Sequence, residues 1–457
     1  MWNIIKLWLI IKIIKRNIYK ELLDWKKDKN KKPLLILGQR QIGKTYIIRE
    51  FGKNEYKKIV ELNFLNNPDD KLFFEKSKGF NNLLNNLIND FDVDPTNIDD
   101  YLFFFDEIQE CPEAIMALKM INEADLKINL ICSGSYLDYK KASFQISFPI
   151  GQFTTIKMKQ IMFDEFVRAV GKKRILDQAI KEIKNKSEIS PIIHNELLKW
   201  FNYYLRIGGF PEVVKTFIED EQYIYRKAYK KLEEIHEGYK ADIQKYSEIF
   251  NKKEFLLLIY DHITKFLSVE NKKWVFQKLD QTKKYRDLEP YLIWLNNSTL
   301  IIKIENLEDI QYPFKNKNKN NYFKIYYNDH GFLALNYDLD NRLNSTNFDK
   351  IKGALFENFV ISQFLNQFRN IYYYSWIKNN NERYEIDFVV ANNENESCLI
   401  EVKSGKIGRL SSLNQIKNQD NKFKFVLSTN NYEEFETHTN IPIYFAFMLK
   451  EIISDNE

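Results

Sequence analysis

The chain has 457 residues, more than one hydrophobic core usually serves, so two to four domains are expected. Apolar residues make up 44% of the sequence and aromatic residues 15%, which is enough to bury real cores. The formal charge of +5 is too small to indicate nucleic-acid binding through a long-range field, so any such site must be a local patch.

Cysteine and histidine chemistry is not expected. The three cysteines, Cys111, Cys132 and Cys398, show no CxxC spacing, which argues against disulfides and structural zinc and favours a reducing compartment. The five histidines show no paired spacing such as HExxH. A cytoplasmic location is therefore predicted.

The opening stretch MWNIIKLWLIIKIIKR is nearly all apolar. Lys6 and Lys12 interrupt it, and it is shorter than the roughly 20 residues of a membrane span. It also lacks the small-residue cleavage site of a signal peptide. We expect residues 1–30 to be an N-terminal helical segment that docks on the protein, with a translation start further downstream and an interfacial helix as alternatives, and no membrane span.

Residues 31–163 alternate short apolar runs with helical patterns. Strands are expected at 33–38, 57–64, 101–107 and 128–135, and helices at 44–52 and 80–90. Continuous apolar runs separated by helices are typical of a parallel sheet covered on both faces. An α/β P-loop NTPase core is predicted here.

The stretch GQRQIGKT fits the phosphate-binding pattern G-x-x-x-x-G-K-[ST], and it lies between a predicted strand and a predicted helix. The two glycines let backbone N–H groups surround phosphate oxygens at the positive end of the helix. Lys44 would neutralise the outer phosphates, and the Thr45 hydroxyl would bind Mg²⁺. The alternative is an ordinary glycine turn. The predicted ATP-binding residues of this loop are Gly38, Gln39, Arg40, Gln41, Ile42, Gly43, Lys44 and Thr45.

Acidic residues end a second buried strand about 60 residues later, in LFFFDE. Asp106 would hold Mg²⁺ through water, and Glu107 would polarise the attacking water. A merely solvated acidic pair is the alternative. In the next strand, Ser133 or Ser135 would sense the γ-phosphate, unless these small residues only form a tight turn.

Helical patterns dominate residues 164–250, where a helical lid is predicted. The break RIGGFPEVVK interrupts them, because Gly208, Gly209 and Pro211 end one helix and start another. Arg206 precedes this break. It either contacts nucleotide from the lid or anchors the helix end.

Residues 251–340 show three short helical stretches followed by two strands around the basic loop KNKNKNN. That order is typical of a winged helix-turn-helix, so DNA is a predicted partner. The lysine and asparagine content of the loop partly reflects the whole chain, and it adds little to this prediction.

Residues 350–457 form a last predicted α/β domain. Its strands EIDFVVA and SCLIEVKS bring Asp387 close to Glu401 and Lys403, which face the same side because they are two residues apart. This is the PD-(D/E)xK pattern, in which Asp387 and Glu401 bind Mg²⁺ and Lys403 activates water. Glu357 on the preceding helix would be a third metal ligand. A half-buried hairpin with an exposed polar face is the alternative.

The order of these motifs resembles a family of archaeal and bacterial AAA-type ATPases, similar to the AAA+ and STAND lineages. Its C-terminal domain of unknown function looks like a restriction endonuclease. The resemblance rests on GQRQIGKT, FFFDEIQECP, ICSGSYL, FPIGQFTTIKMKQIMFDEF, RIGGFPEVV, YYNDHGFLA, GALFENFV, EIDFVV and IEVKS. Family members commonly have a basic residue where Gln152 follows Gly151, so this segment is not expected to supply a charge-stabilising finger.

Together these features predict an ATP- and Mg²⁺-dependent AAA-type ATPase coupled through a lid and winged helix to a nuclease-like domain that binds DNA. The alternative is a nucleotide-dependent regulatory switch whose C-terminal domain binds a protein partner without cleavage. A third option is a ring-shaped DNA-remodelling motor. Homo-oligomerisation, the choice between DNA and RNA, and the pathway stay open at this point.

Overall fold

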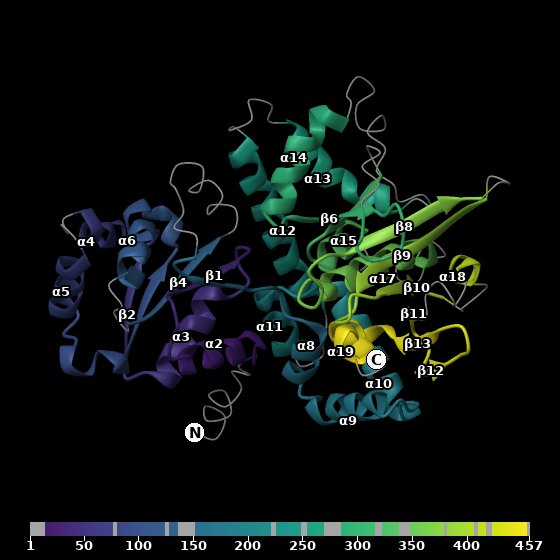
Figure 1. Ribbon diagram of the computed structural model, residues 1–457, viewed down its shortest axis with the longest axis horizontal. Helices are drawn as coiled ribbons and strands as arrows, with labels where there is room; N and C mark the ends of the chain where they lie inside the picture. The colour runs from purple at the N-terminus through teal and green to yellow at the C-terminus, as the bar shows by residue number, and fades with distance from the viewer. Residues whose placement is uncertain are drawn as a thin grey trace. The chain divides into compact units, whose positions relative to one another are not determined.

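A computed structural model describes residues 14–75, 80–123, 128–135, 151–220, 225–247, 254–268, 285–315, 322–337, 348–378, 382–405, 410–416 and 423–454 (Figure 1). The chain divides into a compact unit of residues 15–160 and a second unit that contains residues 161–457. The predicted docking helix of residues 1–13 lies outside the described residues. No helix within the described ranges is both long and apolar enough to cross a membrane.

The first unit contains a parallel sheet of five strands in the order β2-β3-β4-β1-β5. β1, β3 and β4 are buried along their whole length, as the continuous apolar runs predicted. β5 was not predicted, because only Ile156 of its four residues is buried. The strands are β1 (Leu34–Gly38), β2 (Lys58–Asn63), β3 (Tyr101–Asp106), β4 (Asn129–Ser135) and β5 (Thr154–Lys157).

Helices cover both faces of this sheet (Figure 1). On one face α3 lies close to the strands, since a Cβ at Gly52 would be 2.6 Å from the Ile59 side chain. α2 packs on α3 through the rings of Tyr19 and Phe51, 5.5 Å apart. The other face is an apolar cluster beneath α4, α5 and α6. The helices are α2 (Ile18–Lys27), α3 (Lys44–Glu55), α4 (Leu72–Glu75), α5 (Phe80–Asp90) and α6 (Pro112–Glu123), with short 3₁₀ turns η1 (Pro68–Lys71), η2 (Pro95–Asp100) and η3 (Ile108–Glu110).

The second unit begins with helices, as the periodicity predicted. α10 is central to them, because Phe201 and Tyr204 on its buried face contact the ring of Phe359 on α17. The helices in this part of the chain are α8 (Phe163–Ala169), α9 (Lys173–Lys184), α10 (Pro191–Ile207), α11 (Pro211–Glu219), α12 (Tyr225–Ser247), α13 (Glu254–Leu267), α14 (Tyr285–Asn297), α15 (His330–Asn336) and α17 (Phe348–Phe364).

The same unit holds a mixed sheet of eight strands in the order β12-β13-β11-β10-β9-β8-β6-β7. Its remaining helical elements are α18 (Ser411–Gln415), η6 (Ile443–Met448) and α19 (Leu449–Ser454). The strands are β6 (Ile301–Asn306), β7 (Phe323–Tyr327), β8 (Tyr372–Ile377), β9 (Arg383–Ala391), β10 (Ser397–Val402), β11 (Phe423–Ser428), β12 (Glu433–Glu434) and β13 (Thr439–Pro442).

The two strands predicted as a wing are the antiparallel pair β6 and β7. β6 also pairs with β8, so this hairpin continues the sheet of the C-terminal part. Two parts of the predicted winged helix, the helix at 271–279 and most of the basic loop at 315–321, lie outside the described residues. The winged helix and the boundaries of the five predicted domains therefore stay predictions.

The break RIGGFP is held by a distant carboxylate. Asp329 accepts the backbone N–H of Gly209 at 2.8 Å and that of Gly331 at 2.7 Å, which caps α15. Gly208 has φ = 73°, and a Cβ there would lie 2.0 Å from the Asp329 carboxylate. Only glycine meets both requirements, so two motifs far apart in the sequence form one structural joint.

Gly208→Ala should therefore lower the free energy of unfolding by about 3 kcal/mol or more, through backbone strain and overlap with Asp329. Gly238→Ala is the matched control, because Gly238 lies inside α12 with open space around its Cα. This change should raise stability by about 0.5–1 kcal/mol. Urea unfolding of both variants measures the difference, and equal midpoints would contradict the joint.

Candidate functional site

The phosphate-binding loop connects β1 to α3 and forms a tight turn. Gln41 and Gly43 have left-handed φ values of 62° and 87°. At Gly38 a Cβ would lie 2.4 Å from the Ile42 side chain and 2.8 Å from the Met158 carbonyl oxygen. Consecutive N–H groups in such a turn form a concave site for an anion, next to the N-terminus of α3.

Lys44 is held inside this loop. Its side chain is 6% exposed, and Nζ donates to the carbonyl oxygens of Gly38 at 3.1 Å and Gln39 at 2.8 Å. The ammonium therefore lies at the same turn as the N–H groups. Positive charge and backbone donors are combined where phosphate groups would bind.

Asp106 links four elements at the carboxyl edge of the sheet. This carboxylate, 2% exposed, accepts the Thr45 hydroxyl at 2.9 Å and the Asn63 amide at 2.9 Å. The Ser133 hydroxyl also donates to it. Thr45 lies in the first turn of α3, whereas the other three residues belong to β2, β3 and β4, so the network fixes the end of β3 against the phosphate-binding loop.

The donor set fits Mg²⁺. A threonine hydroxyl and a carboxylate in direct contact are hard oxygen ligands, and Mg²⁺ normally keeps several waters and binds one or two protein groups beside the phosphates. Thr45 and Asp106 would hold the ion. Ser133, predicted to sense the γ-phosphate, donates its hydroxyl to Asp106, and its contact with nucleotide stays a prediction.

Glu107 follows Asp106 in a strained conformation, with φ = 54° for a residue other than glycine. Its carboxylate accepts the Gln109 side-chain amide at 2.6 Å. The strand end thus turns sharply at the residue that was predicted to polarise water. Its catalytic role stays a prediction.

Two supporting residues were missed in the sequence. Arg16, 9% exposed, donates to the Ile42 carbonyl oxygen at 3.1 Å and to the Lys159 carbonyl oxygen at 2.6 Å, so it ties the loop to the segment after β5. No motif marks Arg16. Asn63 could have been found, because it ends a predicted strand at the same edge as Asp106.

Asp106→Ala should leave three donors without their acceptor and remove the predicted Mg²⁺ contact. Loss of charge-assisted hydrogen bonds of this kind corresponds to about 10- to 150-fold. We expect the stimulation of ATP binding by Mg²⁺ to fall by that factor, measured by titration with a fluorescent nucleotide in Mg²⁺ and in EDTA. Asp99→Ala, an exposed aspartate before the opposite end of β3, is the control. Unchanged stimulation in Asp106→Ala would refute the assignment.

The C-terminal acidic residues also come together. Ile400 pairs with Phe388, so Glu401 and Asp387 are the next neighbours along β10 and β9. Asp387 accepts the Val402 N–H at 2.8 Å, and Lys403 lies 2.5 Å from Glu401.

Glu401 is 5% exposed and Glu357 on α17 is 4% exposed. The alternative of an exposed polar face therefore does not hold for Glu401. The metal role predicted for Glu357, Asp387 and Glu401 stays a prediction. Within the described residues, no group of three or more His, Cys, Asp or Glu side chains is arranged to hold a metal ion.

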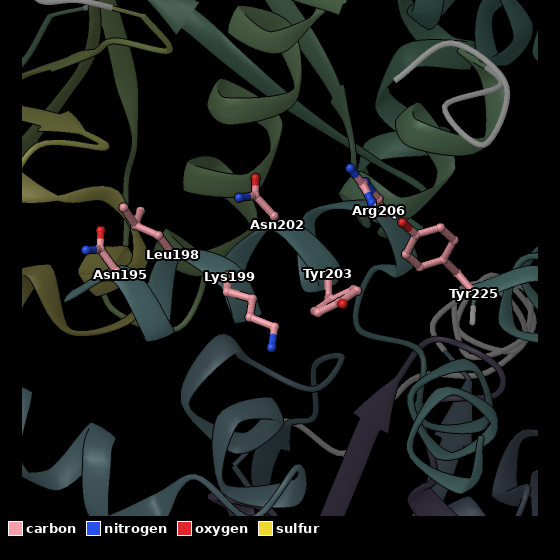
Figure 2. Close-up of a pocket in the computed structure, with 7 residues that line it drawn as sticks. All are labelled: Asn195, Leu198, Lys199, Asn202, Tyr203, Arg206 and Tyr225. Carbon is pink, nitrogen blue, oxygen red and sulfur yellow. Dashed lines mark hydrogen bonds between the residues drawn. The ribbon is translucent and has the colours of Figure 1, made fainter. Parts of the chain in front are cut away.

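Arg206 lines a cavity of about 400 Å³ on one side of α10. Figure 2 shows its guanidinium beside Tyr225, whose hydroxyl it contacts and whose ring centre is 5.0 Å away. The structure thus describes Arg206 as an anchor between α10 and the start of α12, and contact with nucleotide stays a prediction. The cavity is lined by Asn195, Leu198, Lys199, Asn202, Tyr203, Arg206 and Tyr225.

A known protein family matches the part of the chain that contains the phosphate-binding loop and Asp106. Residues 30–167 match the AAA domain family. This part of the chain is therefore similar to AAA domains. Beyond the AAA domain, residues 198–342 and 352–446 match two domains of unknown function, DUF8612 and DUF4143.

Individual relatives add little about activity. The uncharacterized protein MJ1544 of Methanocaldococcus jannaschii is 26% identical over 388 residues, which is 83% of this chain and 75% of that protein. The Walker-type ATPase PABY2304 of Pyrococcus abyssi superposes with a TM-score of 0.42 at 14% identity, over 72% of this chain and 96% of that one. Drosophila ORC bound to DNA gives a TM-score of 0.28 at 14% identity, over 63% and 86%. At TM-scores of this size the likenesses do not bear on what the present chain binds.

Proposed function

We propose that the protein binds ATP with Mg²⁺ at the loop of residues 38–45 and hydrolyses it. The observation that carries this proposal is the contact between Thr45 and Asp106, which joins a phosphate-binding loop to a buried carboxylate at the end of β3. An ordinary glycine turn would not require a contact between Thr45 and Asp106. The match of residues 30–167 to the AAA domain supports the same function.

Each residue then has a definite task. Lys44 and the loop N–H groups neutralise and orient the outer phosphates. When bound, Mg²⁺ would supply positive charge that offsets the charge developing on the phosphates. Thr45 and Asp106 would position it, while Glu107 accepts a hydrogen bond from the attacking water and directs it at the γ-phosphate.

Lys44→Ala and Glu107→Gln should separate binding from hydrolysis. Lys44→Ala should abolish ATP hydrolysis and weaken ATP binding, because the counter-charge is lost. Glu107→Gln should retain ATP binding and lower the turnover rate by about 10²- to 10⁴-fold. Phosphate release and nucleotide titration measure the two quantities. Lys53→Ala, an exposed lysine on the same helix, should behave like the wild type.

Hydrolysis by Lys44→Ala at the wild-type rate would exclude this loop as the site. Full turnover by Glu107→Gln would leave the loop assigned but remove Glu107 from catalysis.

We propose further that nucleotide state controls how the second unit engages nucleic acid. The support is the sequence pattern of a winged helix-turn-helix and of a nuclease-like domain. The competing function is a switch that binds a protein partner.

The salt dependence of DNA affinity distinguishes these functions, because phosphate contacts release counterions. If about three phosphates are contacted, affinity should fall about 40-fold between 50 and 200 mM salt. Fluorescence anisotropy with ATP, with ADP and without nucleotide measures the slope. Absence of DNA binding under all three conditions would favour a protein partner.

A further inference from the structure

Lys324 is a fully buried lysine among the acidic residues of the C-terminal sheet. It belongs to β7, and its side chain is 0% exposed. The ammonium nitrogen lies 2.6 Å from Glu385, 3.8 Å from Glu357 and 3.9 Å from Asp387. β7 and β9 are separated in the sheet by β6 and β8, so the sheet must curve strongly for these contacts to form.

The charge of Lys324 is balanced from several elements. The carboxylates of Glu385 and Asp387 on β9 and of Glu357 on α17 all lie within 4 Å of the ammonium nitrogen. A buried cation at this place therefore has the paired counter-charges that burial requires. The ring centre of Tyr373 is 5.1 Å from the nitrogen.

A divalent metal does not fit the cluster in this arrangement. One carboxylate oxygen of Glu357 and one of Asp387 lie within 4 Å of the ammonium nitrogen. The other Asp387 oxygen accepts the Val402 N–H, and Glu357 also accepts the Tyr326 hydroxyl at 3.0 Å.

Glu401 is paired through Oε1 with Lys403 at 2.5 Å, whereas its Oε2 is buried and has no hydrogen-bond partner among the described residues. A dication at this place would lie beside a buried positive charge that water cannot screen.

We propose that the Lys324 ammonium is the resident cation of this cluster, in the place where a nuclease of the PD-(D/E)xK type would hold its metal. The acidic residues then stabilise the junction of β7, β9 and α17. The domain binds its partner without cleaving phosphodiester bonds. This inference is independent of ATP hydrolysis by the first unit.

Removing the ammonium should open the cluster to a metal. In full-length protein that carries Asp106→Ala, so that the nucleotide site does not take up the ion, Mn²⁺ binding is measured from the electron paramagnetic resonance signal of free Mn²⁺. The parent chain should bind no Mn²⁺ at the C-terminal cluster. Lys324→Met should gain one site, at least tenfold tighter than any in the parent, and Asp387→Asn should remove it again.

The matched control is Lys303→Met on the neighbouring strand β6. Lys303 is also mostly buried, with a side chain 13% exposed, and pairs with Glu305 at 3.0 Å, outside the cluster. It should gain no site. If Lys324→Met fails to fold, the double variant Lys324→Met with Glu385→Gln restores the charge balance. In either case the Mn²⁺ titration of the parent chain tests whether the cluster already binds a metal.

Two results would overturn the proposal. One is a Mn²⁺ site in the parent chain that Asp387→Asn abolishes. The other is cleavage of plasmid DNA by the wild-type protein in Mn²⁺ or Mg²⁺ that Asp387→Asn eliminates. A folded Lys324→Met chain that gains no Mn²⁺ site would also count against the metal-like position of the ammonium. ATPase activity of the wild-type protein and of Lys324→Met without the Asp106→Ala change keeps failure of this proposal separate from failure of the ATPase assignment.

Discussion

The polar groups of the candidate nucleotide site lie at the edge of the first unit's sheet where its strands end. β1, β3 and β4 are buried along their length, so their faces hold only groups that need no water or that find partners inside. Parallel strands end at the same edge, which brings Gly38, Asp106 and Ser133 together. This common edge explains the positions of the phosphate-binding loop, the Asp106 carboxylate and the hydroxyl groups that donate to it.

The C-terminal sheet differs from the first sheet, because its charged side chains are buried away from an open edge. Glu357 and Glu401 are almost fully buried, and each has a lysine within 4 Å. A buried ion pair contributes little net stability, but leaving one partner alone is strongly unfavourable. Carboxylates that look like metal ligands in the sequence can therefore be ligands of an ammonium group in the folded chain.

The sequence predicts what depends on neighbouring residues. Continuous apolar runs identify β1, β3 and β4, and the motif GQRQIGKT identifies the loop together with Lys44 and Thr45. Asp106 is predictable because it ends a buried strand. All of these signals are contained in short segments, whose structure local patterning largely determines.

What could not be predicted depends on contacts between distant segments. Lys324 is the one charged residue in YFKIYY, and this segment gives no sign of what pairs with it, since its partners come from α17 and β9. Arg16 is similar, because its acceptors are Ile42 and Lys159. β5 is too short and too exposed to be recognised, and its position beside β1 becomes clear only from the sheet.

The bond between Gly209 and Asp329 spans 120 residues of sequence, which has a consequence for synthesis on the ribosome. At rates of roughly 5–20 residues per second, the turn after α10 emerges about 6 to 24 seconds before its carboxylate does. The partners of the aromatic face of α10 are synthesised later still, because Phe201 packs on Phe356 and Phe359. α8 can pack on α10 early, through Phe163 and Phe166, but the part of the α10 face that meets α17 lacks its partner during this interval. The second unit therefore completes its core only when most of the chain has been made.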